Sequence, residues 1–314
     1  MNTISLENIE TAAGSINPIY LNSPQYRSEG LSGLLNLSLV CKVETVNPIG
    51  CFKGRGVDWW ARCNPHIKQL VCLSSGNLGQ ALAYVGREMG IEVHIFTIET
   101  ANPTKVKSME ALDAIVHLHG KKYREARAEA ARFAKANDFY LLIDEEEFEI
   151  SEGAGTIAVE LGKYPDAFDV LYVPVGGGTL INGVGTWFKA NSPETKIIGV
   201  CAKGAPAMQL SWREGRVVCT DTVDTIADGV TVSEPVSQSV ELLTTSVNEI
   251  VLVDDPDIIQ AMHAFYKHEK IVLEPAGAIS LAAAMVDAHK NVGKTVGIIL
   301  SGSNISPQDR DKWF

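Results

Sequence analysis

One lysine, Lys53, has a sequence context that favours covalent chemistry with a carbonyl group. It lies between Phe52 and Gly54, shortly after the turn-forming run Pro48-Ile49-Gly50. An aromatic neighbour shields one side of the amine, and a partly desolvated amine is a nucleophile toward carbonyl carbon. A surface lysine in a turn is the simpler interpretation of these residues alone. The interpretation of Lys53 as a reactive amine therefore needs support from other polar loops.

A glycine run, Gly176-Gly177-Gly178-Thr179, lies between an apolar strand predicted over residues 170–174 and a helix predicted over 180–190. Consecutive glycines allow backbone N–H groups to converge on an anion, and the N-terminus of the following helix adds a favourable dipole. A tight turn that requires positive φ is the alternative. Three glycines in a row exceed what such a turn needs, so the run predicts a phosphate site.

Two common nucleotide motifs do not fit these residues. A dinucleotide fingerprint would place glycine at Ile181, and a P-loop ending in Gly293-Lys294-Thr295 would place glycine at Ala288. A phosphate site of neither kind, combined with a lysine suited to Schiff-base formation, predicts pyridoxal 5′-phosphate (PLP) as the cofactor.

Two further loops carry hydroxyl and amide groups after apolar strands. Ser74-Ser75-Gly76-Asn77 follows a strand predicted over 70–73, and its backbone N–H groups can hold a carboxylate. Ser301-Gly302-Ser303-Asn304 follows a strand predicted over 296–300, where Ser301 can meet the ring nitrogen of a pyridine. A helix cap and an ordinary polar turn are the alternatives.

Apolar strands alternate with helical patterns through most of the chain. The first series has strands at 70–73, 93–96, 115–118 and 140–143, separated by helices at 78–89, 103–112 and 123–136. A second series, of helices at 152–161, 180–190, 256–268 and 276–288 and strands at 170–174, 197–200, 250–253 and 296–300, follows it. This order predicts an α/β fold of two lobes with parallel sheets, whose loops at the carboxyl ends of strands bind ligands.

Composition restricts the classes of partner. The 314 residues carry a formal net charge of −11, which argues against binding nucleic acid or an anionic membrane surface. No apolar stretch approaches the roughly 20 residues that span a bilayer, and residues 1–13 lack the basic region of a secretory signal. We therefore expect a cytoplasmic protein. We further expect it to form a homodimer. The scattered cysteines predict reduced thiols.

Taken together, the loops resemble the fold-type II PLP enzymes, and within them the threonine/serine dehydratase (ammonia-lyase) and serine racemase branch. The matching segments occur in the family's order over most of the chain: Cys51-Phe52-Lys53-Gly54-Arg55-Gly56, Ser74-Ser75-Gly76-Asn77, Pro174-Val175-Gly176-Gly177-Gly178, Ile226-Ala227-Asp228-Gly229, Glu274-Pro275-Ala276-Gly277-Ala278 and Ser301-Gly302-Ser303-Asn304. The resemblance implies a tryptophan synthase β-like fold with a large PLP-binding domain, residues 1–68 and 146–314, and a small domain, residues 69–145. The acidic run at residues 144–147 marks the junction, with a solvated helix start as the alternative.

The resemblance also implies a role for each site residue. Lys53 would carry PLP as a Schiff base and act as the base on the substrate's α-proton, and Ser75 would be the acid of a racemase. The remaining residues would bind the cofactor (Phe52, Asn77 at O3′, Gly176, Gly177, Gly178, Thr179 and Leu180 at the phosphate, Gly229, Glu274, and Ser301 at the ring nitrogen) or the substrate (Ser74, Ser75, Gly76 and Asn77).

The implied reaction is β-elimination from L-threonine or L-serine, which yields a 2-oxo acid and ammonia. The cofactor phosphate would be the acid for the leaving hydroxyl. A serine or hydroxyaspartate racemase and a β-replacement or threonine synthase-like enzyme stay open as alternatives, and a non-enzymatic PLP binder is disfavoured because every chemical position is filled.

Some positions depart from the family's pattern. Thr179 replaces a fourth glycine, Leu78 replaces a histidine, and Lys42-Val43-Glu44-Thr45 differs from the usual Lys-x-Glu-Asp. Cys201-Ala202-Lys203 lacks the acidic residue that begins the divalent-metal site of racemase-like members. We therefore expect no metal site.

Overall fold

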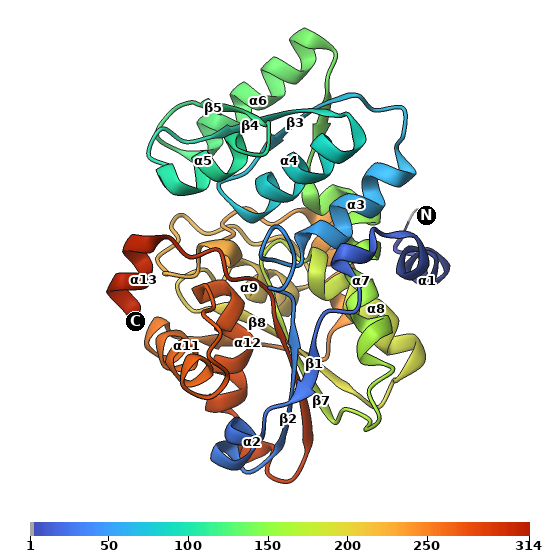
Figure 1. The fold of residues 1–314 in the computed structure, drawn as a ribbon, viewed down its shortest axis with the longest axis vertical. Helices are drawn as coiled ribbons and strands as arrows, with labels where there is room; N and C mark the ends of the chain where they lie inside the picture. The colour runs from blue at the N-terminus through green and yellow to red at the C-terminus, as the bar shows by residue number, and fades with distance from the viewer. Residues whose placement is uncertain (1–2) are drawn as a thin grey trace.

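The computed structural model, which describes residues 3–314, contains two sheets that form separate layers of one molecule (Figure 1). The larger sheet has the order β1-β2-β10-β7-β8-β9, and only the edge strand β1 is antiparallel to its neighbour. Its strands are β1 (Gln25–Arg27), β2 (Ser38–Val43), β7 (Val170–Pro174), β8 (Lys196–Ala202), β9 (Glu249–Val253) and β10 (Thr295–Leu300).

The smaller sheet is entirely parallel, with the order β5-β4-β3-β6. It comprises β3 (Gln69–Leu73), β4 (Glu92–Thr97), β5 (Ile115–Leu118) and β6 (Tyr140–Leu142), with helices α4 (Asn77–Met89), α5 (Pro103–Glu110) and α6 (Tyr123–Asn137). Successive side chains of a strand point to opposite faces. Leu70 and Cys72 accordingly pack in the cluster that contains α4 residues, whereas Val71 packs with Ala130 of α6.

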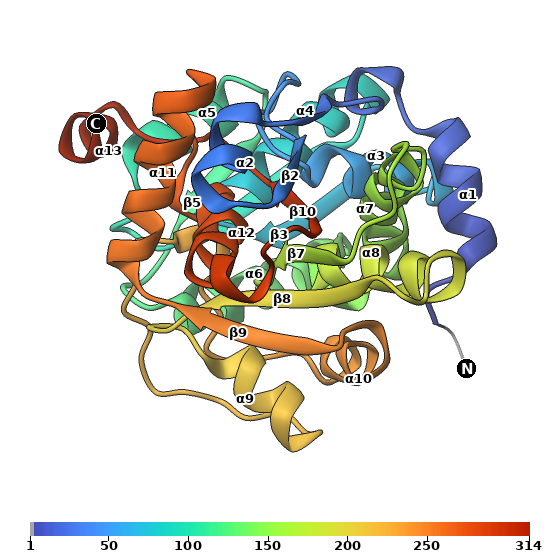
Figure 2. The ribbon, with the colours of Figure 1, turned by 90° about the horizontal axis from the view of Figure 1, so that it is seen from below.

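Helices cover both faces of the larger sheet, and successive side chains of a strand again point to opposite faces. Leu39 and Cys41 of β2 join a core formed with α2 (Glu29–Leu35), α11 (Asp255–Glu269) and α12 (Pro275–Val286). Val40 joins the opposite core, formed with α1 (Leu6–Ser15), α7 (Phe148–Leu161), α8 (Thr179–Asn191) and α10 (Ser237–Ser246). Helices α9 (Ala207–Glu214) and α10 lie beside the edge strand β9 (Figure 2). A short helix, α13 (Pro307–Trp313), lies near the C-terminus.

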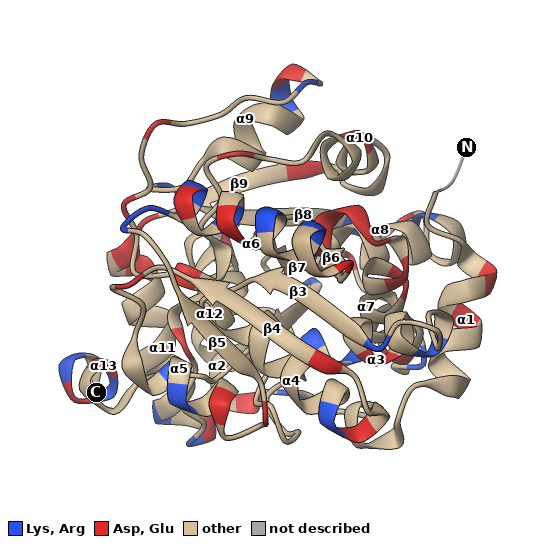
Figure 3. Cartoon of the chain, turned by 90° about the horizontal axis from the view of Figure 1, so that it is seen from above, with Lys and Arg blue, Asp and Glu red and all other residues tan. Residues whose placement is uncertain are grey.

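Charge is confined largely to helices and loops. Figure 3 shows β3 and β7 free of Lys, Arg, Asp and Glu, as expected for strands buried between helices. Among residues 3–314, no helix combines the length and apolar character needed to cross a membrane.

The predicted α/β alternation is confirmed, with differences at the ends of elements. The helix predicted to begin at residue 152 begins at Phe148, and the one predicted over 276–288 ends at Val286, before a separate 3₁₀ turn at Ala288–Lys290. Sequence patterns also missed α1, α2, α9, α10 and α13, which are short or weakly periodic.

The most consequential missed element is α3 (Lys53–Cys63), because Lys53 is its first residue and does not lie in an open turn. Glycines at 54 and 56 disfavour an isolated helix. Packing against α7 overrides that preference: a Cβ on Gly56 would lie 2.5 Å from the Ile150 carbonyl oxygen, and one on Gly153 would lie 2.4 Å from the Arg55 carbonyl oxygen. Only glycine permits so close a crossing of the two helices.

Candidate active site

The loops singled out in the sequence surround one cavity of about 350 Å³. It lies at the carboxyl ends of β3, β7 and β10, so strands of both sheets contribute to it. Its lining includes every predicted site residue: Phe52, Lys53, Ser74, Ser75, Gly76, Asn77, Gly176, Gly177, Gly178, Thr179, Leu180, Gly229, Glu274 and Ser301. The structure brings these residues together, while their individual roles stay predictions.

Lys53 projects into this cavity with its side chain 16% exposed. Its amine forms an ion pair with Asp144 and donates a hydrogen bond to Thr179 Oγ1 at 3.3 Å. The amine also lies 5.2 Å from the centre of the Phe52 ring, within the range of a cation–π contact. An amine in this position can react with a ligand carbonyl in the cavity.

The glycine loop forms the N-terminus of α8. Gly178 has φ +104°, in the left-handed region, and a Cβ there would lie 2.2 Å from Ser239 Oγ. Asn182 Nδ2 donates to the Ser239 carbonyl oxygen at 3.1 Å, which fixes the wall behind the loop. Thr179 is buried as the first residue of the helix. The loop thus has backbone N–H groups and a helix dipole to offer an anion, although the fourth position is not glycine.

The loop after β3 is held by its own serine. Ser74 Oγ accepts hydrogen bonds from the Gly76 N–H at 3.2 Å and the Gly79 N–H at 2.9 Å. Ser74 therefore shapes the start of α4, whereas Ser75 lines the cavity with a partly exposed side chain. This arrangement leaves Ser75 better placed than Ser74 to contact a substrate.

Asn77 and Glu274 connect the two lobes within the cavity. Asn77 Nδ2 donates to Glu274 Oε1 at 2.7 Å, and Asn304 Nδ2 donates to Asn77 Oδ1 at 2.7 Å. Burial raises the pKa of Glu274 to about 7, with the positive charge of Lys105 opposing this shift and the negative charge of Asp228 adding to it. The Glu274 carboxyl group therefore titrates near neutral pH.

This shift predicts a pH-dependent stability. The pKa of Glu274 is about 7 in the folded protein, against an ordinary value of 4.5 for a glutamate. The folded state therefore holds a proton between these two pH values that the unfolded state releases, and stability falls as pH rises through that window. Glu274→Gln removes the effect and still accepts the Asn77 hydrogen bond. Between pH 4.5 and 7, we expect the free energy of unfolding of the variant to rise relative to that of the parent, by up to about 1.4 kcal/mol per pH unit. Above about pH 7 we expect no further relative gain.

Urea unfolding of the cofactor-free protein at several pH values measures this gain. The exposed Glu241→Gln variant is the control, for which we expect no comparable slope. Parallel stability curves for the parent and Glu274→Gln would contradict the prediction.

Ser301 lies directly after β10 and is buried at the cavity wall. Its hydroxyl makes only a long contact, 3.4 Å, to the Ala276 carbonyl oxygen. Its own carbonyl oxygen accepts a hydrogen bond from the Phe52 N–H at 3.1 Å, which ties the lysine segment to the serine loop. The hydroxyl is thus available to a ligand atom while its backbone is fixed.

Two acidic residues that the sequence indicated only as part of the lobe junction belong to the cavity. Asp144 is 8% exposed, and Glu145 lies against Gly177. Asp144 pairs with Lys53 through one oxygen, while its Oδ1 is buried without a hydrogen-bond partner among residues 3–314. The signal that could have identified them is their place directly after β6, at the same sheet edge as Ser74.

Two ion pairs also connect the lobes beside the cavity. Lys105 of α5 pairs with Asp228, and Arg127 of α6 pairs with Glu234 at 3.5 Å. Across residues 3–314, no three His, Cys, Asp or Glu side chains gather in a way that would hold a metal ion.

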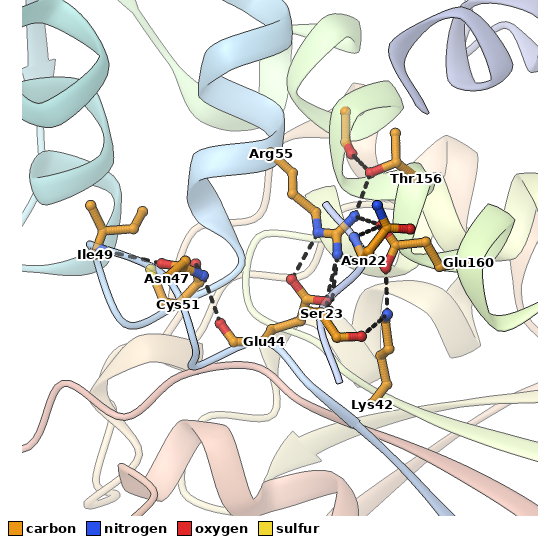
Figure 4. Close-up of polar contacts among 11 residues, drawn as sticks. Asn22, Ser23, Lys42, Glu44, Asn47, Ile49, Cys51, Arg55, Thr156 and Glu160 are labelled. Carbon is orange, nitrogen blue, oxygen red and sulfur yellow. Dashed lines mark hydrogen bonds and ion pairs between the residues drawn. The ribbon is translucent and has the colours of Figure 1, made fainter. Parts of the chain in front are cut away.

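A buried charge network surrounds Arg55, which lies on α3 two residues after Lys53 (Figure 4). Arg55 contacts Glu44 at 2.8 Å and Glu160 at 2.7 Å, and Lys42 pairs with Glu160 as well. Burial alone would raise the pKa of Glu160, but the hydrogen bonds and charge of Arg55, together with Lys42, lower it to about 2. Each buried charge thus has a partner, and the network fixes the helix that begins with Lys53.

Comparison with known proteins places the chain in a family. The sequence model of the pyridoxal-phosphate dependent enzymes matches residues 16–302, and the chain belongs to this family. Its cofactor is pyridoxal 5′-phosphate, and the two-lobed fold-type II architecture expected from the motifs is confirmed.

The chain is similar to several characterised members. It is 31% identical over 305 residues to an L-threonine ammonia-lyase of Thermotoga maritima, covering 96% of this chain and 76% of that protein. The structure of the processed form of threonine deaminase isoform 2 from Solanum lycopersicum superposes with a TM-score of 0.90 at 29% identity, covering 99% of this chain and 88% of the other. Maize serine racemase gives a TM-score of 0.91 at 26% identity, with coverage of 99% and 97%.

Proposed function

We propose that this protein is an ammonia-lyase that converts L-threonine or L-serine to a 2-oxo acid and ammonia. The observation that carries the proposal is the single cavity in which the Lys53 amine, the glycine loop at the start of α8 and the neutral Ser301 hydroxyl meet. The threonine ammonia-lyase and threonine deaminase among its relatives support it.

The cavity residues fit PLP. The Gly176-Gly177-Gly178-Thr179 loop is a cradle for the phosphate, and the Cβ positions of Gly177 and Gly178 are already occupied by neighbouring side chains, so larger residues would close it. Ser301 would hold the ring nitrogen, Asn77 the phenolic oxygen O3′, and Lys53 the carbonyl carbon. When bound, PLP supplies an electron sink that makes the α-proton of an amino acid removable.

Side chains and backbone groups of the protein itself would bind the substrate and remove its α-proton. The Ser74-Ser75-Gly76-Asn77 loop would bind the substrate carboxylate with the backbone N–H groups of Ser75 and Asn77 at the start of α4, a 13-residue helix, because the Gly76 N–H already donates to Ser74 Oγ. This contact orients the α-proton toward the Lys53 amine, which removes it as general base. A neutral hydroxyl at Ser301, in place of a carboxylate, leaves the ring less electron-withdrawing, which favours prompt loss of the β-substituent.

Assay of the purified, PLP-loaded protein against a panel of amino acids tests the proposal. We expect 2-oxobutanoate from L-threonine or pyruvate from L-serine, each with one equivalent of ammonia. Failure to form a 2-oxo acid from any hydroxy amino acid would contradict the proposed function and favour a β-replacement synthase.

A racemase is the second candidate, because Ser75 places a partly exposed hydroxyl in the cavity and because maize serine racemase has the same fold. Ser75→Ala is expected to suppress formation of any D-amino acid by about 10²-fold or more, the usual contribution of a positioned acid. Some elimination should remain, since Lys53 still serves the L-substrate. Chiral analysis of products beside the 2-oxo acid assay measures both, and equal loss of the two activities would show that Ser75 only binds substrate.

We also propose that residues 69–145 form the small domain and residues 1–68 and 146–314 the large one. The four strands of the smaller sheet all lie within 69–145, and the six of the larger sheet lie outside it, which supports this division. The homodimer and the cytoplasmic location stay predictions from the sequence. Light scattering of the purified protein tests the first.

A further inference from the structure

The carboxyl group of Glu145 lies next to the glycine loop, Gly176-Gly177-Gly178-Thr179. It lies in the 3₁₀ turn Asp144–Glu146, which follows β6, and it lines the same cavity as Lys53. A Cβ on Gly177 would lie 2.0 Å from Glu145 Oε1 and 2.6 Å from its Cδ. The carboxyl group therefore lies next to the loop, in the cavity that Lys53 also lines.

The surroundings of Glu145 raise the pKa of its carboxyl group above the ordinary value. Burial is the main cause that raises its pKa, and the negative charge of Asp144 raises it further, while Lys53 and Arg127 act in the opposite direction. Arg127 is itself paired with Glu234. Cofactor loading adds the negative charge of a phosphate to this region, which acts in the same direction as Asp144 and raises the pKa of Glu145 further.

Asp144 provides an independent sign of a ligand. Its side chain is more than nine-tenths buried and lines the cavity, and Oδ1 has no donor among residues 3–314. Buried acceptors are seldom left without a partner, because the loss of hydration costs free energy. A hydroxyl group that enters the cavity can donate to this oxygen.

Loss of a β-hydroxyl requires an acid, because hydroxide is a poor leaving group. We propose that Glu145 is the catalytic acid that protonates the departing β-hydroxyl, with Asp144 Oδ1 orienting that hydroxyl by accepting its hydrogen bond. This inference rests on the proposed function and assigns to the protein the proton that the sequence resemblance assigned to the cofactor phosphate.

The step is balanced. Lys53 takes the α-proton, and the electron pair of the Cα–H bond forms the Cα–Cβ double bond. The Cβ–O bond breaks with its pair going to oxygen, which takes the proton from the Glu145 O–H bond and leaves as water. Glu145 remains as a carboxylate, and the proton gained by Lys53 is returned to it through solvent.

The test compares two leaving groups in the PLP-loaded Glu145→Gln variant. Chloride leaves without a proton, so elimination from β-chloro-L-alanine needs no acid, whereas elimination from L-serine does. We expect kcat with L-serine or L-threonine to fall about 10²- to 10⁴-fold, with kcat for β-chloro-L-alanine within about twofold of the parent value. Glu146→Gln, at an exposed neighbouring site, is the matched control and is expected to change neither.

A spectroscopic measurement accompanies the kinetics. The infrared difference spectrum between the loaded parent protein and Glu145→Gln should contain the band of a protonated carboxylic acid, over and above any band of Glu274, which both proteins share. The difference between the parent and Glu146→Gln should contain no such band. Equal loss of both eliminations, or tighter PLP binding with an unchanged substrate ratio, would overturn the inference, because Glu145 would then be only structural or an obstacle to the cofactor. A parent protein that eliminates chloride but never water would instead overturn the proposed function itself.

Discussion

Replacement of Lys53 by alanine is expected to lower the elimination of water from L-serine or L-threonine by at least about 10³-fold, within the range for loss of a positioned base. The amine projects into the cavity between Phe52 and Thr179, and it is the group proposed both to link the cofactor and to remove the α-proton. Steady-state turnover of the purified variant in excess PLP measures the loss.

A covalent assay makes the assignment specific. Borohydride reduction of the native parent protein, followed by peptide mass analysis, should place the reduced cofactor on the peptide that contains Lys53. The Lys53→Ala variant should yield no reduced adduct, whereas Lys68→Ala, at an exposed site, should behave as the parent. Attachment of the cofactor to another lysine of the native parent protein would contradict the assignment.

Replacement of Arg55 by alanine is expected to lower the free energy of unfolding by about 3–5 kcal/mol, the usual cost of removing one partner from a buried ion pair. Arg55 is 1% exposed, and its loss leaves Glu44 without the guanidinium group and Glu160 with Lys42 as its remaining cation in the network. The two carboxylates would then face each other in a region that excludes water. Urea unfolding of the purified variant measures the change.

The same helix provides the matched control. Arg62 pairs with the buried Asp58 at 2.6 Å, but the Arg62 side chain is 39% exposed, so water can take its place beside a carboxylate that also accepts the Asn17 N–H at 2.9 Å. Arg62→Ala should therefore cost far less than Arg55→Ala. Similar costs for the two substitutions would show that the buried network contributes no more than a surface pair.

The loops of the site were predictable because each follows an apolar strand in a run of β-α units. Parallel strands of one sheet place their carboxyl ends at one edge, so Gly177 and Ser301, which follow β7 and β10, had to approach one another once the strands were recognised. Ser75 follows β3 of the other sheet, and its approach was expected only from the resemblance to the family. Their residue types then favoured an anion cradle and a neutral partner for a ring nitrogen. Local sequence was sufficient for this part of the site.

The remaining parts depend on contacts that no local pattern contains. In sequence, the acidic residues Asp144 and Glu145 resemble a solvated helix start. Their place in the site depends on the contact of Asp144 with Lys53, which lies more than ninety residues earlier in the chain. Lys42 and Glu44 appeared only as a departure from a family motif. Their importance lies in burial beside Arg55, which depends on how α3 crosses α7.

That crossing has a mechanical consequence. Helix α7 contacts α3 through Gly153 and α8 through Gly183, where a Cβ would lie 2.4 Å and 1.9 Å from the carbonyl oxygens of Arg55 and Ser151. At both the α7–α3 and the α7–α8 contact, the backbones of the two helices touch directly at a glycine, with no flexible side chain between them. Lys53 begins α3 and the glycine loop begins α8, so one helix sets the separation of the two groups proposed to hold the cofactor. The loop proposed to bind the substrate carboxylate follows β3 of the other sheet, so we expect substrate to exchange without a change in that separation.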